Sequence, residues 1–223
     1  MARALAFEAP APPPEGVSEP ALHTEAGVIR TRLHLASAGD AAVLWVFGSG
    51  GGLGGPAGGV YTRLGEQLRL QGVTSLELDY RRPGALVACV ADVLTGIAWL
   101  QALGRRRVVL VGHSFGAAVA ISAGVYSPHV IAVAALSSQG EGTQGVSRLS
   151  PRPVLFAHGE ADEVLPDRFS RDLYTRAREP KRLILYPGCG HGLDVCRDAL
   201  DRDLTQWLGE VLALGARARQ ADV

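Results

Sequence analysis

Short apolar runs typical of buried strands alternate with longer helix-like segments along most of the chain. The run RVVLV at Arg107–Val111 is continuous and rich in β-branched residues, as in a strand buried on both faces of a sheet. This alternation predicts an open, mostly parallel sheet with helices on both faces. The other expected strands are Val28–Leu35, Ala42–Phe47, Val73–Leu78, Val130–Leu136, Val154–Ala157 and Leu183–Tyr186, and the expected helices lie near Tyr61–Leu70, Ala85–Leu103, Phe115–Val125, Asp167–Arg178 and Asp194–Leu214.

The chain has 223 residues, which is enough for one sizeable core and too few for two full domains. Residues 1–22 are rich in Pro and Ala, with APAPPPEG at their centre, and we expect an extended or disordered lead-in there. The single domain then covers residues 23–215, and residues 216–223 form a C-terminal tail.

The charge balance excludes some classes of partner. The chain has 22 basic and 22 acidic residues, which argues against nucleic acid or an anionic membrane surface as the main partner. The segment Ala85–Leu103 is long and apolar, but Asp92 in its middle and its place between two expected strands indicate a buried helix instead of a membrane span. The sequence gives no signal of the oligomeric state.

The cysteines indicate a reducing compartment. Cys89, Cys189 and Cys196 are an odd number, so no disulfide framework can use all three. The N-terminal residues lack the long apolar core of a secretory signal, and we therefore expect a cytoplasmic protein. No His, Cys and Asp cluster has metal-site spacing, so neither a metal nor another cofactor is expected.

The pentapeptide GHSFG at 112–116 lies between the RVVLV run and an Ala-rich helix. A G-x-S-x-G motif between a strand and a helix is the context of a nucleophile elbow. The sharp turn would place Ser114 at a helix N-terminus, where backbone N–H groups favour a developing negative charge. A loop serine that only caps a helix is the alternative, because the motif by itself is common in Gly-rich sequences.

Two further motifs provide a base and an acid for this serine. HGEADEVLP follows the strand at Val154–Ala157 and contains Asp162, and PGCGHG follows the strand at Leu183–Tyr186 and contains His191. Each motif lies just beyond a strand, where open parallel sheets bind their ligands. Asp162 as a helix cap and His191 as a surface histidine are the alternatives for each residue alone. The order Ser, acid, His favours a catalytic set.

These three motifs resemble those of the α/β hydrolases, over roughly residues 28–212. The resemblance implies a mostly parallel sheet of about seven or eight strands with helices on both faces. It places the acid at Asp162, with Glu160, Glu163 and Asp194 as the alternatives. Only the short polar segment 137–150 stands where many members carry a cap, so we expect little or no cap and a similarity to small dienelactone-hydrolase-like and carboxylesterase proteins.

The resemblance also implies roles for these residues. Ser114 would attack an acyl carbonyl, His191 would move the proton, and Asp162 would orient the imidazole. The oxyanion would be bound by the backbone N–H groups of Phe115 and Ser49, with Gly50 as the reserve donor. The family's usual His before this Gly-X pair is replaced by Phe47.

The stretch FGSGGGLGGPAGG at 47–59 also satisfies G-x-G-x-x-G, the dinucleotide-binding fingerprint, with Glu77 and Asp79 downstream as acid candidates. However, the fingerprint needs a helix to open at its third glycine, whereas Pro56, Gly58 and Gly59 prolong the loop. A nucleotide-binding oxidoreductase is therefore the weaker interpretation, and an oxyanion is the charge that we expect this loop to meet.

The predicted function is a serine hydrolase that cleaves small-molecule carboxylic esters through an acyl-enzyme. A thioesterase or acyltransferase with the same residues, or a non-catalytic scaffold that binds a ligand or partner, are the alternatives. His113 and His158 are expected to be structural, and Cys189 is not expected to be a nucleophile. Arg81 or Arg82, past the end of a strand, is a candidate for contact with a substrate carboxylate, although a surface ion pair is the favoured interpretation.

Overall fold

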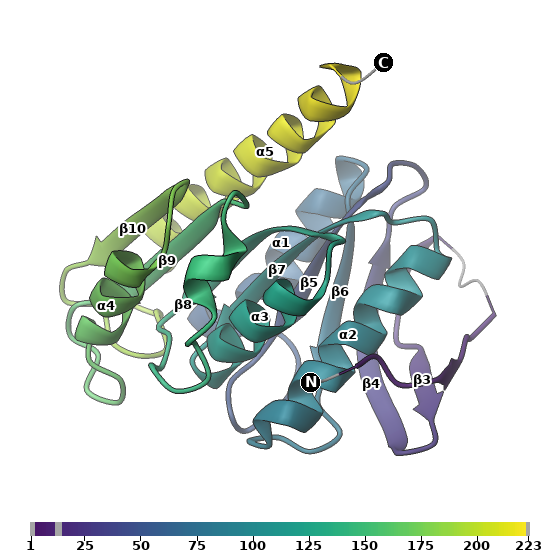
Figure 1. Ribbon diagram of the computed structural model, residues 1–223, viewed down its shortest axis with the longest axis horizontal. Helices are drawn as coiled ribbons and strands as arrows, with labels where there is room; N and C mark the ends of the chain where they lie inside the picture. Colours follow the sequence, from purple (N-terminus) through teal and green to yellow (C-terminus); the bar gives the residue numbers. More distant parts are fainter. Residues whose placement is uncertain (1–2, 12–14, 222–223) are drawn as a thin grey trace.

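The computed structural model describes residues 3–11 and 15–221. Across these residues ten strands form one sheet in the order β1-β3-β4-β6-β5-β7-β8-β9-β10, with β2 paired to β4 (Figure 1). From β6 to β10 the neighbouring strands are parallel, whereas β4 is antiparallel to β6. The strands are β1 Phe7–Glu8, β2 Gly16–Ser18, β3 Ala21–Thr24, β4 Gly27–Leu35, β5 Ala41–Val46, β6 Thr74–Asp79, β7 Arg107–His113, β8 Val130–Leu136, β9 Val154–Gly159 and β10 Lys181–Tyr186.

Helices cover both faces of the sheet, as the sequence predicts (Figure 1). Alternate residues of β5 point to opposite faces: Leu44 and Val46 pack in a core with α2, α3 and α4, and Val43 and Trp45 pack in a second core with α1 and α5. β5 and β8 contribute only apolar residues to these cores, which explains their uninterrupted hydrophobic runs. The helices are α1 Pro56–Leu70, α2 Leu86–Ala102, α3 Phe115–Tyr126, α4 Arg168–Arg176 and α5 Arg197–Ala221.

Both chain ends carry regular secondary structure among the described residues. The short strands β1 and β2 lie within residues 1–22, where we expected an extended or disordered lead-in, and β3 begins there and ends at Thr24. These strands raise the total above the expected seven or eight. They are too short to show a period-2 pattern. β2 and β3 form because the edge of β4 offers backbone partners, and β1 pairs in turn with β3. Leu22 is completely buried. At the other end, α5 continues to Ala221 through most of the predicted tail.

The segment between β8 and β9 contains only a short 3₁₀ helix, η1 Val146–Leu149, among the elements that the structure describes. It packs on α3 through the buried Val146 and Leu149. The predicted lack of a substantial cap is therefore confirmed.

The described helices include none that is long and apolar enough to cross a membrane. In α2, which carries the apolar segment noted above, Asp92 is buried and forms an ion pair with Arg81.

Candidate active site

Ser114 occupies a strained turn between β7 and α3. Its φ of 59° and ψ of −124° are unusual for a residue with a side chain. The flanking glycines are required by space: a Cβ on Gly112 would lie 2.1 Å from the Gly116 carbonyl oxygen, and a Cβ on Gly116 would lie 2.2 Å from the Phe47 carbonyl oxygen. The G-x-S-x-G pattern thus follows from close backbone packing that leaves the serine at the tip of the turn.

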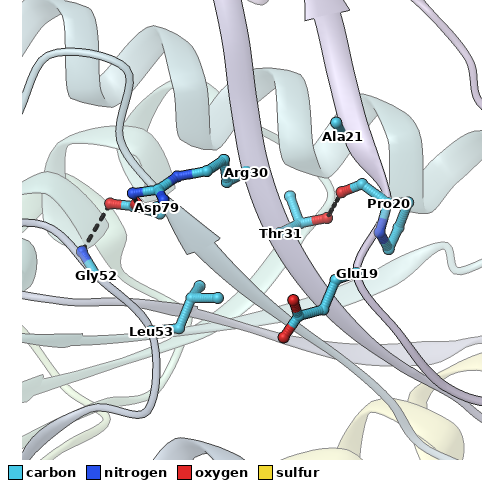
Figure 2. Close-up of a pocket in the computed structure, with 8 residues that line it drawn as sticks. All are labelled: Glu19, Pro20, Ala21, Arg30, Thr31, Gly52, Leu53 and Asp79. Atoms are coloured by element: carbon cyan, nitrogen blue, oxygen red, sulfur yellow. Dashed lines mark hydrogen bonds and ion pairs between the residues drawn. The ribbon is translucent and has the colours of Figure 1, made fainter.

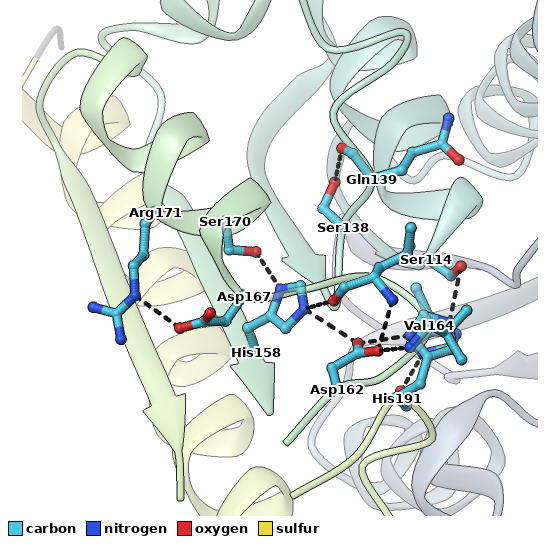
Figure 3. A network of polar contacts seen from close by, with 12 residues as sticks. Ser114, Ser138, Gln139, His158, Asp162, Val164, Asp167, Ser170, Arg171 and His191 are labelled. Carbon is cyan, nitrogen blue, oxygen red and sulfur yellow. Dashed lines mark hydrogen bonds and ion pairs between the residues drawn. The ribbon is translucent and has the colours of Figure 1, made fainter. Parts of the chain in front are cut away.

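The turn brings Ser114 together with His191 and Asp162, although the three residues follow three different strands (Figure 3). The Ser114 Oγ lies 3.1 Å from Nε2 of His191, and Nδ1 of His191 lies 2.7 Å from Oδ2 of Asp162. If Nδ1–H donates to the carboxylate, Nε2 is left to accept the serine proton. This geometry matches a hydroxyl, a base and an orienting acid in series.

Asp162 is fixed by more than His191. Its Oδ1 accepts hydrogen bonds from the backbone N–H groups of Val164 (2.9 Å) and Leu165 (2.8 Å), and its side chain is fully buried. Burial by itself would raise the pKa of Asp162, but the Leu165 N–H, His191 and the Val164 N–H outweigh it and lower that pKa below its usual value. The carboxylate therefore stays charged and faces the imidazole.

The other acidic candidates lie elsewhere. Glu160 pairs with Arg171 near the surface, and Glu163 is exposed. Asp194 is exposed, and its carbonyl oxygen accepts from the Arg197 N–H at the start of α5. The geometry thus selects Asp162 among the predicted acids.

Two further histidines support these loops. His113 is buried beside Ser114, and its Nε2–H donates to the carbonyl oxygen of His191 (2.9 Å). Its ring also stacks on Phe47, with 5.7 Å between ring centroids. Burial lowers the pKa of His113 to about 4, so this ring is neutral at pH 7. The interpretation of His113 as a packed, structural residue agrees with these contacts.

His158 lies behind the acid. Its Nε2 is 2.7 Å from the Leu165 carbonyl oxygen and 3.2 Å from Asp162 Oδ2, so one N–H is shared between them. Its Nδ1 accepts from the Ser170 hydroxyl at 2.7 Å. Burial lowers the pKa of His158 as well. Figure 3 shows this chain of contacts from Ser170 to Ser114.

The loop after β5 passes next to the serine. A Cβ on Gly48 would lie 3.6 Å from Cβ of Ser114, and Ser49 and Gly50 are exposed directly beyond it. Phe115 is the first residue of α3, so its N–H has no carbonyl partner within the helix. The structure therefore brings the Phe47–Gly50 segment and the start of α3 to the same place.

Farther along, the glycine loop binds carboxylates of its own chain. The Gly52 N–H donates to Asp79 Oδ1 (2.7 Å), and the Gly54 N–H donates to Glu77 Oε2 (2.5 Å). Both acids come from the end of β6, the strand beside β5. These are the two residues considered above as the acid of a dinucleotide site, and here they anchor the loop itself. The dinucleotide interpretation therefore has no free amide at Gly52 or Gly54 to support it.

Arg81 fits neither a substrate contact nor a surface ion pair, the two roles considered for it from the sequence. Its side chain is 7% exposed, and the guanidinium donates from Nε to Asp92 Oδ1 at 2.6 Å and from Nη1 to the Ala26 carbonyl oxygen at 2.8 Å. The pair is buried instead of lying on the surface, because Asp92 projects from the inner side of α2. Arg81 is thus committed to the fold and is not a substrate-binding candidate.

The cysteine prediction was also incomplete. Cys189 and Cys196 form a disulfide, and Cys89 is a buried free thiol. An odd number of cysteines excludes only a framework that uses all of them, and a single short bridge within one loop gives no other sequence signal. Cys189 cannot act as a nucleophile while it is bonded to Cys196. From the sequence, too, we did not expect it to be one. Within the described residues no group of His, Cys, Asp and Glu side chains could hold a metal ion.

A cavity of about 370 Å³, which the sequence does not predict, lies between the β3–β4 hairpin and the glycine loop (Figure 2). Arg30 and Asp79 form an ion pair in its wall, and Leu53 and Thr31 also line it. Glu19 and Pro20 complete the wall from the segment that was predicted to be a lead-in, so the cavity could not be anticipated.

Comparison of sequences gives distant relatives. No protein-family model matches the chain. The uncharacterized protein YfhR of Escherichia coli K12 is 48% identical over 50 residues, covering 22% of this chain and 18% of YfhR. The uncharacterized protein Rv2307c of Mycobacterium tuberculosis is 29% identical over 171 residues, covering 60% of this chain and 61% of that protein. The chain thus spans less than two thirds of the length of these curated relatives.

Solved structures match over almost the whole domain. The esterase domain of a Rhodothermus marinus protein superposes with a TM-score of 0.72 at 18% identity, covering 86% of this chain and 97% of that domain. XC6422 of Xanthomonas campestris, described as an α/β serine hydrolase without a lid, gives a TM-score of 0.64 at 19% identity, covering 87% and 96%. Because these domains are matched nearly end to end, the chain has the fold of the α/β hydrolases.

Proposed function

We propose that this protein is a serine hydrolase that cleaves carboxylic esters through an acyl-enzyme intermediate. The observation that carries the proposal is the hydrogen-bonded series Ser114–His191–Asp162, with the serine at a strained strand-to-helix turn. A binding scaffold has no need for a serine, a base and an acid aligned in this way.

In the proposed reaction, Ser114 Oγ attacks the ester carbonyl while His191 Nε2 accepts its proton. His191 then returns that proton to the leaving alkoxide, which departs as the alcohol and leaves an acyl group on Ser114. Water, deprotonated by the same imidazole, releases the acid and restores the serine. Asp162 stabilises the imidazolium in both halves, consistent with its buried carboxylate and its lowered pKa.

The oxyanion formed in each half needs two donors. We assign the Phe115 N–H as the first, since it lies at the start of α3 next to the nucleophile. The Ser49 N–H is the second, with Gly50 in reserve, because the Phe47–Gly50 segment adjoins Ser114. Removal of one such donor costs about 10²–10³-fold in kcat in serine hydrolases.

The substrate side is open. The short β8–β9 connection gives no cap over the described site, so we expect short-chain or bulky small-molecule esters and little selectivity among them. Thioester hydrolysis or acyl transfer would use the same residues, and a screen of acyl-chain lengths on matched esters and thioesters separates them. We retain the cytoplasm as the proposed compartment, but the Cys189–Cys196 disulfide removes the cysteine count as an argument for it.

The test compares Ser114→Ala with Ser122→Ala on p-nitrophenyl acetate and butyrate. Ser122 is a matched control, because it lies in the same helix and donates to the Gly142 carbonyl oxygen, outside the proposed site. We expect Ser114→Ala to lower kcat about 10⁴-fold or more, while Ser122→Ala keeps its activity. Full hydrolysis by a folded Ser114→Ala protein would overturn the assignment of the nucleophile.

A further inference from the structure

The loop that carries His191 is closed by a covalent bond. Cys189 and Cys196 form a disulfide whose Cα atoms are 5.7 Å apart, and His191 lies between them in the sequence. The loop connects the end of β10 to the start of α5. The disulfide therefore encloses the candidate base in a small ring.

One end of this ring is fixed to the acid loop. Cys189 is completely buried, and its carbonyl oxygen accepts the N–H of Ala161, the residue before Asp162, at 3.0 Å. A Cβ on Gly159 would lie 2.1 Å from the same carbonyl oxygen, so the two loops are in close backbone contact. The backbone at Cys189 is thus held against the loop that carries Asp162.

The other end is fixed to α5. Cys196 is half-buried, and its carbonyl oxygen accepts the Leu200 N–H at 2.9 Å in the first turn of that helix. The disulfide consequently links the loop that contacts the Asp162 loop to α5, which packs on one face of the sheet.

The ring has an inner half and an outer half. On the inner half, the Gly192 carbonyl oxygen accepts the Ala57 N–H at 2.7 Å, and the His191 carbonyl oxygen accepts from His113. On the outer half, Asp194 is exposed and Val195 is 82% exposed. The buried Leu193 lies between them with a φ of 58°, a backbone conformation that side chains rarely adopt. The disulfide at Cys196 is a covalent link on this outer half.

We propose that the Cys189–Cys196 disulfide is a positioning element that holds His191 against Ser114 and Asp162, so that reduction of the bond slows turnover. This inference rests on the proposed function. In the reduction, a dithiol such as dithiothreitol supplies two electrons and two protons: the S–S bond breaks, two cysteine thiols form, and the reagent becomes its cyclic disulfide. Both cysteines act through His191 and touch no reacting atom.

The effect falls on the chemical step. A base displaced by about 1 Å can lower the rate by a large factor, whereas binding at an open site depends little on the histidine. We expect kcat to fall about 10-fold on reduction with KM unchanged, and to recover after the reductant is removed and the protein is reoxidised with oxidised glutathione.

The experiment measures p-nitrophenyl butyrate hydrolysis by the oxidised and the dithiothreitol-reduced protein, with melting curves in both buffers to show that each form is folded. Thiol titration in denaturant should find one free thiol before reduction and three after it, because Cys89 is free in both forms. A Cys189→Ala/Cys196→Ala protein should have a low kcat that does not respond to reductant. Cys89→Ala should respond like the wild type.

The outcomes separate the two proposals. An active, folded enzyme whose kcat is unchanged by complete reduction overturns this inference, as does a double variant that is still inhibited by dithiothreitol, or three free thiols in the oxidised protein. A wild type that hydrolyses no ester or thioester in either redox form overturns the proposed function instead.

Discussion

Two glycine-containing loops meet at Ser114, and they use glycine for different reasons. In GHSFG, Gly112 and Gly116 are glycine because a Cβ would collide with backbone atoms at 2.1 and 2.2 Å. In the loop after β5, Gly52 and Gly54 have positive φ, and their N–H groups bind the carboxylates of Asp79 and Glu77.

The comparison shows that a short motif under a steric constraint can be identified from its letters, because few other residues would fit. A long glycine loop, in contrast, is defined by partners elsewhere in the chain. The second loop matches the dinucleotide fingerprint through the spacing of its glycines, and the sequence does not show that Asp79 and Glu77 on the next strand bind two of its N–H groups.

The largest expected effect tests whether the glycines of GHSFG are required by close backbone packing. Gly116→Ala should lower the free energy of unfolding by about 4 kcal/mol, or prevent folding, since overpacking against rigid backbone is among the most destabilising changes. Gly50→Ala is the matched control: no atom lies within 4 Å of its Cβ position, and we expect a change within about 0.5 kcal/mol. Urea unfolding of both variants checks this, and equal costs would break the comparison.

The contact between the loops predicts a pH dependence. His113 is buried against Phe47, and its pKa falls from 6.5 to about 4 on folding. Below pH 6.5 the unfolded chain takes up a proton that the folded chain does not, so stability falls as the pH drops towards 4 and is fully present above 6.5.

The contribution of His113 to this fall is about 3 kcal/mol at most. Urea unfolding between pH 7 and pH 4 should therefore show a shallower loss for His113→Asn than for the wild type. The other histidine with a lowered pKa, His158, is common to both proteins and cancels in the difference. Parallel pH profiles would show that His113 is not buried as a neutral ring.

A third change tests whether carboxylates hold the glycine loop after β5. Glu77 is buried and accepts from the Gly54 N–H, from Thr62 at 2.9 Å and from Nε2 of His34 at 3.1 Å. Glu77→Gln replaces an acceptor with an amide N–H₂ that faces these donors, and should cost about 2 kcal/mol. Glu66→Gln weakens a surface pair with Arg69 and a longer contact with His34 at 3.6 Å, together worth less than about 0.5 kcal/mol. Similar costs in urea unfolding would argue that the loop is not anchored by Glu77.

The smallest effect concerns Ser49. If its backbone N–H is the second oxyanion donor, the side chain is dispensable, because Ser49→Ala keeps that N–H. We expect kcat for p-nitrophenyl butyrate to stay within about threefold of the wild type. A loss of about 10²-fold would instead assign a role to the Ser49 hydroxyl.

The sequence predicts the parallel part of the sheet and the convergence of Ser114, Asp162 and His191, because buried strands have continuous apolar runs and their ends lie at one edge of the sheet. It does not predict β1–β3, since two to four residues show no periodicity, and these strands form by pairing with β4 or, for β1, with β3.

Long-range partners account for the other differences. Arg81 was expected near the surface because it follows a strand, yet its partner Asp92 faces inward from α2. The Cys189–Cys196 bond was missed because an odd cysteine count says nothing about one pair. In both cases the contact forms between side chains that the fold brings together, and the local sequence does not show that they are close.

The central claim, that Ser114 is the activated nucleophile, is tested most directly by intact-protein and peptide mass spectrometry after reaction with a fluorophosphonate. The account predicts one covalent adduct per chain, on the peptide that contains Ser114, and no adduct on Ser114→Ala. An unmodified wild type, or an equal adduct on Ser114→Ala, would contradict it.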